Sequence, residues 1–241
     1  MKINKLTGLI LIVLSSLLYW SCGQKNTRDG IKKSFESDLR NFMLEFTDSV
    51  NVPGMGFAFY SDKVGTVMQV VGNADNENSL PLQPGTHYPV QSTTKMFLSI
   101  VTLQLIGEDR LSLESTIGQW TDNVPNGEHI TIRHLLQHTS GLIPYQANTE
   151  FMEEYYLNTS KKYNRDDFIN AGLAIPYKAE NIGTHIYSNT NYLILANIVE
   201  KITHNTIGQE YNQRIFRPAG MSNTYYKPEI TNDTIEIIKC Y

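Results

Sequence analysis

The chain of 241 residues is poor in cysteine and in charge. It has two cysteines, Cys22 and Cys240, and 18% charged residues with a formal net charge of −4. The small negative charge gives no indication of the basic surface that nucleic-acid binding requires. The sequence has no internal repeat and no low-complexity tract. Its 41% hydrophobic residues are enough for one globular domain with a substantial core.

The N-terminal segment has the pattern of an export signal. Lys2 and Lys5 precede an apolar run over residues 6–20, and a small residue then precedes Cys22. This run is shorter than the roughly 20 residues that a membrane-spanning helix needs. The pattern resembles a bacterial lipoprotein signal. We therefore expect a signal peptide over residues 1–22, ending at lipidated Cys22, and a polar tether over residues 23–30.

The lipoprotein pattern also predicts location. We expect a protein of the bacterial cell envelope, lipid-anchored to the membrane and facing the periplasm or the exterior. Lipid on Cys22 would leave Cys240 without a disulfide partner in the mature chain. Tyr19 and Trp20 are larger than the residues usual at these positions, so plain secretion and an uncleaved anchor stay open as alternatives.

Residues 31–241 have the patterns of a mixed α/β domain. Apolar spacing predicts an amphipathic helix over residues 31–50. Alternating segments at 56–60 and 66–71 predict two strands joined by a turn. Helices follow: one at Ser92 with an apolar run to Gly107, and others at 131–141, 191–203 and 209–216. The run before Gly107 is apolar on every side, which predicts a buried helix.

A Ser-x-x-Lys sequence, Ser92-Thr93-Thr94-Lys95, begins the apolar run. On a helix, residues three apart share a face, so Lys95 can place its amine beside the Ser92 hydroxyl. A serine becomes a good nucleophile when a neighbouring base takes its proton. A helix N-terminus also favours the negative charge that develops in such a reaction. The alternative is that Ser92 is a helix cap and Lys95 is solvated.

Further motifs follow in order along the chain. Tyr187-Ser188-Asn189 lies downstream of the serine and directly precedes an amphipathic helix. Other matching stretches are Val52-Pro53-Gly54, Gly72-Asn73-Ala74-Asp75, Thr86, Ile130 to Leu142 (ITIRHLLQHTSGL), Tyr187 to Tyr192 (YSNTNY) and Ile215 to Met221 (IFRPAGM). From about Val52 to Tyr226 the chain resembles the serine β-lactamase-like superfamily: class C β-lactamases, D-alanyl-D-alanine carboxypeptidases and related esterases, in which Ser-x-x-Lys is the first element.

The resemblance implies a fold and a set of roles. The fold would be α/β (α+β): an antiparallel sheet flanked by helices, plus a helical lobe. Ser92 would be the nucleophile, Lys95 and Tyr187 would share the proton transfers, and Asn189 would bind Lys95 or the substrate amide. Whether Lys95 or Tyr187 is the base stays open. Substrates would be D-Ala-D-Ala peptides, β-lactams or small esters, and the reaction would need no metal or organic cofactor.

A second Tyr-x-Asn, Tyr156-Leu157-Asn158, could take the place of Tyr187-Ser188-Asn189. It lies in a polar, acidic stretch that predicts a solvated helix, so we favour Tyr187. The nearby tyrosines Tyr155, Tyr156 and Tyr163 could line a substrate cleft, although packing on the lobe surface is the favoured interpretation.

Two histidines, His134 and His138, have the i, i+4 spacing of a zinc site. The residues between them do not include the glutamate of the His-Glu-x-x-His motif of zinc metalloproteases. We therefore expect structural roles for both histidines and no metal site.

The third element of the superfamily, Lys/His-x-Gly, does not occur after Met221. The sequence alone therefore suggests a partial domain over residues 31–241, with the C-terminal strands and helix missing. The resemblance implies that the missing strand supplies one of the two backbone N–H groups of the oxyanion hole. Loss of one such donor typically lowers the rate by about 10²–10³-fold, so we expect weak or no activity. The alternative function is a non-catalytic, membrane-tethered binding protein that retains the fold.

Overall fold

The computed structural model describes residues 28–75, 77 and 79–226. These residues form two compact units, one of residues 28–88 and one of residues 89–226. The predicted signal peptide, the lipidation of Cys22, most of the tether and Cys240 lie outside the described residues, so those predictions stay untested. Within the described residues, none of the helices combines the length and the apolar character needed to cross a membrane.

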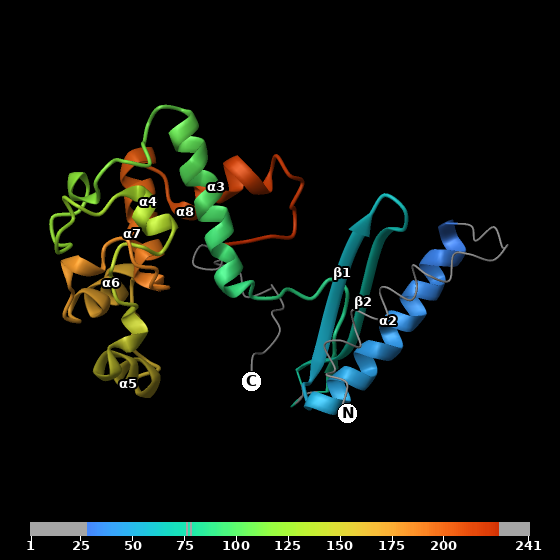
Figure 1. Ribbon diagram of the computed structural model, residues 1–241. Coiled ribbons are helices and arrows are strands. Elements are labelled where there is room, and N and C mark those ends of the chain that lie inside the picture. Colours follow the sequence, from blue (N-terminus) through green and yellow to red (C-terminus); the bar gives the residue numbers. More distant parts are fainter. Residues whose placement is uncertain (1–27, 76, 78, 227–241) are drawn as a thin grey trace, which may run out of the picture. The chain divides into compact units, whose positions relative to one another are not determined.

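The first unit consists of a long helix and a small antiparallel sheet (Figure 1). Its elements are α2 (Arg28–Val50), β1 (Gly54–Ser61), β2 (Gly65–Asp75) and β3 (Leu80–Pro81). The strand order is β1-β2-β3. Strands β1 and β2 pair in a continuous register from Gly54 opposite Gly72 to Ser61 opposite Gly65. The helix and both strands therefore appear where the apolar patterns predict them.

Helix α2 packs along the sheet. Met43 of α2 and Val67 of β2 are fully buried, and the rings of Phe35 and Phe59 lie 5.9 Å apart. Gly72 allows the chain to approach itself closely, because a Cβ at this position would lie 2.2 Å from the carbonyl oxygen of Pro53. Its φ of +78° also favours glycine. A side chain at Gly72 would therefore disturb the start of the β1–β2 pair.

The second unit is helical. Its elements are η2 (Gln91–Thr93), α3 (Thr94–Gly107), η3 (Ile117–Gln119), α4 (Ile132–Leu136), η4 (Tyr145–Ala147), α5 (Thr149–Leu157), α6 (Arg165–Leu173), η5 (Ala179–Asn181), α7 (Asn189–Thr203), α8 (Ile207–Tyr211) and the π-helical η6 (Asn212–Phe216). An isolated bridge joins Thr116 and Thr131. Within this unit, α3, α4 and α8 gather around α7 (Figure 1).

The core of the second unit surrounds α7. Its buried side chains include Leu195 and Ile198 of α7, Val101 and Leu105 of α3, and Leu135 of α4. Burial of a leucine or isoleucine side chain contributes roughly 1.5–3 kcal/mol. This core holds the first turns of α3 and α7 in one unit, and the site described below is built from those turns.

Several predicted boundaries need correction. Ser92 lies in the 3₁₀ turn η2, two residues before α3 begins at Thr94. Helix α4 begins after the expected cap Thr131 but ends at Leu136, because His138 has a φ of +58° and turns the chain before Gly141 is reached. The expected last helix divides into α8 and η6.

The prediction that the Ser92 helix is buried on every side is wrong. Leu98, Val101 and Leu105 face the core, whereas Met96, Ile100 and Leu103 are exposed, Met96 by 62%. The sequence is apolar around the whole helix, but the core of the second unit covers one face only. Apolar composition indicates a tendency to be buried and does not by itself supply a partner for each face.

Candidate active site

Ser92 lies at the start of α3 on a turn with unusual backbone geometry. The preceding residue, Gln91, has a φ of +47°, a conformation that is uncommon for residues other than glycine. Such conformations cost roughly 1–3 kcal/mol and cluster at functional sites. The turn and the 14-residue helix that follows place Ser92 where the positive end of the helix dipole favours negative charge.

Lys95 lies one turn after Ser92 and links the two halves of the site. Its Nζ donates to Oδ1 of Asn189 at 2.6 Å and lies 3.4 Å from Oγ of Ser92. The same ammonium lies over two aromatic rings, 5.1 Å from the centre of Tyr187 and 5.5 Å from the centre of Tyr192. Lys95 therefore lies beside the Ser92 hydroxyl, as the i, i+3 spacing in the sequence predicts.

The Tyr187 hydroxyl donates to Oγ of Ser92 at 3.1 Å. Hydrogen bonding with Lys95 and then with Ser92 lowers the pKa of the Tyr187 phenol from its ordinary value of 10.0. The side chain is 47% exposed, so solvent screens these interactions. A phenol beside an ammonium loses its proton more readily than a free phenol, so more of it is in the basic phenolate form at a given pH.

The start of α7 positions Tyr187 and Asn189. Ser188 is the N-cap residue in an extended conformation, with Tyr187 just before the helix and Asn189 as its first residue. The helix is anchored by its buried apolar face, so its first turn is held firmly against α3. The structure thus brings together the four predicted site residues, Ser92, Lys95, Tyr187 and Asn189.

The competing Tyr156-Leu157-Asn158 lies elsewhere, at the exposed end of α5. The ring of Tyr156 contacts Tyr155, whose centre lies 5.5 Å away. Tyr155 in turn packs against Tyr163 and Phe168. These tyrosines therefore form an aromatic cluster with Phe168, from α5, the segment that follows it and α6.

The two spaced histidines make separate hydrogen bonds. Nδ1 of His134 accepts from the backbone N–H of Thr131 at 3.1 Å and completes a capping box at the start of α4. Nδ1 of His138 accepts from the backbone N–H of Ser188, also at 3.1 Å. Across residues 28–75, 77 and 79–226, no group of three or more histidine, cysteine, aspartate or glutamate side chains is arranged to hold a metal.

The contacts of His138 with the Tyr187 segment are not apparent from sequence. The His138 ring lies 4.4 Å from the ring of Tyr187 and 5.2 Å from that of Tyr192. Asn191, two residues after Asn189, lies beside it. The available signal was the dense polar stretch from His138 to Ser140, which no apolar periodicity explains.

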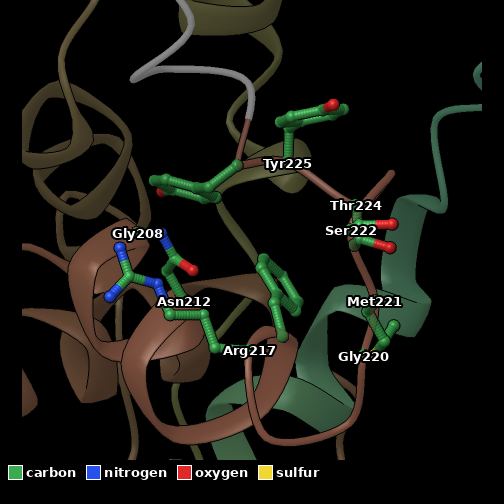
Figure 2. A pocket seen from close by; sticks show the side chains of 10 residues that line it. Gly208, Asn212, Arg217, Gly220, Met221, Ser222, Thr224 and Tyr225 are labelled. Carbon is green, nitrogen blue, oxygen red and sulfur yellow. The ribbon is translucent and has the colours of Figure 1, made fainter.

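A cavity of about 440 Å³ lies in another part of the second unit (Figure 2). Its lining includes Asn212, Arg217 and residues 220–222 and 224–226. None of the four site residues lines it. The proposed chemistry therefore does not use this cavity.

Comparison with known proteins places the chain in a family. The family model described as Beta-lactamase matches residues 39–234. The chain belongs to the beta-lactamase family. Its Ser92–Lys95 and Tyr187–Asn189 elements both lie within the matched residues.

Two curated relatives of this beta-lactamase family chain illustrate the range of related proteins. Penicillin-binding protein 4* of Bacillus subtilis (strain 168) is 31% identical over 153 residues, which cover 64% of this chain and 33% of the relative. A D-aminopeptidase of Brucella anthropi is 27% identical over 219 residues, which cover 85% of this chain and 38% of the relative. The chain thus spans well under half the length of these two relatives.

The fold also resembles that of a solved structure. The D-amino acid amidase from Ochrobactrum anthropi SV3, complexed with D-phenylalanine, matches with a TM-score of 0.74 and 21% identity. The match covers 84% of this chain and 56% of the amidase. The predicted mixed α/β fold, with a small antiparallel sheet and helices, is therefore confirmed for this beta-lactamase family chain.

Proposed function

We propose that the chain is a serine hydrolase that acts through an acyl-enzyme on Ser92. The observation that carries the proposal is the contact of the Ser92 hydroxyl with both Tyr187 and Lys95, at 3.1 and 3.4 Å. A nucleophile and its base within hydrogen-bonding reach, with the base oriented by a third group, is the arrangement that nucleophilic catalysis needs. Lys95 is that third group, and Asn189 holds Lys95.

Tyr187 is the proposed base. Its pKa is lowered by Lys95 and Ser92, and Lys95 already donates to Asn189 at 2.6 Å. In acylation, Oγ of Ser92 bonds to the substrate carbonyl carbon and its proton passes to the Tyr187 phenolate. Tyr187 then gives that proton to the leaving amine or alcohol as the carbonyl carbon–leaving group bond breaks.

Deacylation reverses these roles. A water molecule attacks the ester carbonyl, its proton passes to Tyr187, and the bond between the acyl carbon and Oγ breaks. Oγ then recovers its proton from Tyr187, and a carboxylic acid product leaves. The Lys95 ammonium beside the phenol stabilises the phenolate. These steps use only side chains and water.

The proposed substrates are D-Ala-D-Ala peptides, β-lactams and small esters. The names of the similar proteins support this class, because they refer to penicillin binding, to a D-aminopeptidase and to a D-amino acid amidase. Amides and esters of D-amino acids are therefore the first probes to use alongside a penicillin.

The test is intact mass spectrometry of the purified chain after incubation with a fluorescent penicillin and, separately, an activated D-alanine ester. A covalent adduct is expected on the wild type and on Thr93→Ala, which removes a neighbouring hydroxyl of the same turn. Ser92→Ala should carry none. A folded wild type without an adduct would contradict the proposal and favour a non-catalytic binding protein.

Envelope location is a separate proposal. We infer that Cys22 carries lipid and anchors the mature chain to the membrane, because two lysines, an apolar run and a small residue precede it. Cell fractionation is the test: the wild type should sediment with membranes, and Cys22→Ser should not. Cys240→Ser is the matched control and should remain with the membranes.

A further inference from the structure

His138 holds the segment that carries Tyr187 through two hydrogen bonds. Its carbonyl oxygen accepts from the backbone N–H of Ile186 at 2.8 Å, and its ring Nδ1 accepts from that of Ser188 at 3.1 Å. In an extended segment, alternate residues point the same way. The residue between these two donors is Tyr187, so both bonds restrict the backbone directly beside the phenol.

A buried chain of hydrogen bonds determines which ring nitrogen of His138 accepts. The Ser140 hydroxyl donates to Oδ1 of Asn191 at 2.6 Å. This contact leaves the amide nitrogen of Asn191 to face Nδ1 of His138 at 3.5 Å. Two donors, from Ser188 and Asn191, thus point at Nδ1. The arrangement requires the neutral tautomer with its proton on Nε2.

The ring of His138 also supports the phenol directly. It lies 4.4 Å from the Tyr187 ring, with the two planes inclined by 35°. Ser140, Ser188 and Asn191 are fully buried. The residues that hydrogen-bond with the His138 ring and with one another beside the partly exposed Tyr187 are therefore shielded from water.

We propose that neutral His138 is a positioning residue that holds Tyr187 against Ser92, and that protonation of His138 releases Tyr187 and switches the reaction off in acid. The inference rests on the proposed function, in which Tyr187 transfers the proton of Ser92. A proton on Nδ1 would face the N–H groups of Ser188 and Asn191. Those buried donors would lose their acceptor, and the segment holding Tyr187 would have to move.

The groups around His138 set the direction of its titration. Burial, then the charge of Lys95 from α3 and of His185 from the segment before α7, lower the pKa of His138 below 6.5. Tyr187 and Tyr192 lie against the ring, and His134 lies one turn earlier in α4. The loss of activity that protonation of His138 causes should therefore occur below pH 6.5, in addition to the fall in rate that protonation of the Tyr187 phenolate causes.

The activity test compares three variants for single-turnover acylation of Ser92 across pH. His138→Ala should lower the acylation rate constant by about 10²-fold, with ester affinity changed less than about threefold, because the proton-transfer contribution is lost. His138→Asn keeps an oxygen acceptor at the position of Nδ1, and asparagine tolerates a positive φ. It should keep most of the rate and lose the additional fall in rate below pH 6.5 (the acid limb of His138), leaving only the decline that protonation of the Tyr187 phenolate itself causes. His185→Asn, the matched control, should keep the limb and move it slightly upward in pH.

A second measurement does not depend on activity. In Ser92→Ala protein, ¹⁵N NMR of the histidine rings should show His138 as neutral with the proton on Nε2. ¹³C-labelled tyrosine should report a Tyr187 pKa that rises toward 10 when His138 is replaced by alanine. A proton on Nδ1, or an unchanged acid limb in His138→Asn, would overturn the inference. A wild type that never acylates would instead overturn the proposed function, while the NMR result would still decide the role of His138.

Discussion

The chain contains the same three-letter pattern, Tyr-x-Asn, in two surroundings. In Tyr156-Leu157-Asn158 the pattern ends helix α5, and its tyrosine and leucine are 69% and 77% exposed. In Tyr187-Ser188-Asn189 it begins helix α7, and its central serine is fully buried. In the second copy, the Tyr187 hydroxyl donates a hydrogen bond to Oγ of Ser92, and Oδ1 of Asn189 accepts one from Nζ of Lys95.

The two copies differ in the hydrogen bonds that fix their position, which are local in the first copy and long-range in the second. Asn158 accepts a hydrogen bond from the exposed Ser160 hydroxyl two residues later, which is a local contact. The backbone of Ser188 is held by His138, fifty residues earlier in the chain. A tyrosine that takes part in a reaction, as proposed for Tyr187, would need a fixed position, and a long-range buried contact provides one where a local surface contact does not.

The largest expected effect distinguishes the two tyrosines. Tyr187→Phe removes the hydroxyl that contacts Oγ of Ser92 and should lower the rate of ester hydrolysis by about 10²–10⁴-fold, the usual contribution of a general base. Tyr156→Phe should change it less than about twofold. Steady-state kinetics with a D-alanine ester measures both, and equal losses would contradict the assignment of the base.

The two asparagines should differ by a smaller factor. Asn189→Ala removes the acceptor that lies 2.6 Å from Nζ of Lys95. A hydrogen bond to a charged group contributes about 1.5–3 kcal/mol, so kcat should fall by about 10- to 100-fold. Asn158→Ala serves as the control and should leave kcat within about twofold. A wild-type rate in Asn189→Ala would mean that Lys95 keeps its position unaided.

The stabilisation that the His138 contact gives to the Tyr187-Ser188-Asn189 copy should also depend on pH. Because the folded-state pKa of His138 lies below 6.5, the unfolded chain binds a proton first as the pH falls. The stabilisation is thus complete above pH 6.5 and is lost as the pH falls through the folded-state pKa. Thermal unfolding followed across this range should show a smaller decline in His138→Asn than in the wild type. His129→Asn, at an exposed position, should decline as the wild type does.

The smallest expected effect concerns the middle residue of each copy. Among the described residues, Oγ of Ser188 is buried and has no hydrogen-bond partner. Ser188→Ala should therefore leave stability unchanged or raise it by up to about 1 kcal/mol, because no bond is lost and a polar atom is removed from the interior. Leu157→Ala, on the surface, should change stability by less than about 0.5 kcal/mol. Chemical denaturation compares them, and a large loss in Ser188→Ala would indicate a bound water as the missing partner.

Local patterns predicted much of the fold. The α2 helix, the first two strands, the Thr131 cap and the end of α7 at Thr203 occur as expected. These features depend on side chains near in sequence: apolar spacing, alternation and capping residues. The one-sided burial of α3 and the early end of α4 at Leu136 depend on which surfaces meet and on the positive φ of His138, so periodicity could not predict them.

The residues of the candidate site were also named from sequence: Ser-x-x-Lys places two side chains on one face of a turn, and the family resemblance implied the roles of Tyr187 and Asn189. The choice between two Tyr-x-Asn copies needed the neighbourhood of each. The hydrogen bond of His138 with the backbone of Ser188 was not predicted, since the two residues lie fifty positions apart. The i, i+4 spacing of His138 from His134 allowed a metal pair to be considered, although structural roles were expected for both histidines.

The sequence by itself determined which chemical groups are available and which local elements carry them: a serine and a lysine one turn apart, a tyrosine and an asparagine at a helix start, and the apolar faces that fold around them. Only the tertiary structure decided that these two elements meet, and that His138, Ser140 and Asn191 hold one of them in place. The physical reason is that hydrogen-bond partners and burial depend on distance in space, whereas a sequence pattern reports only distance along the chain.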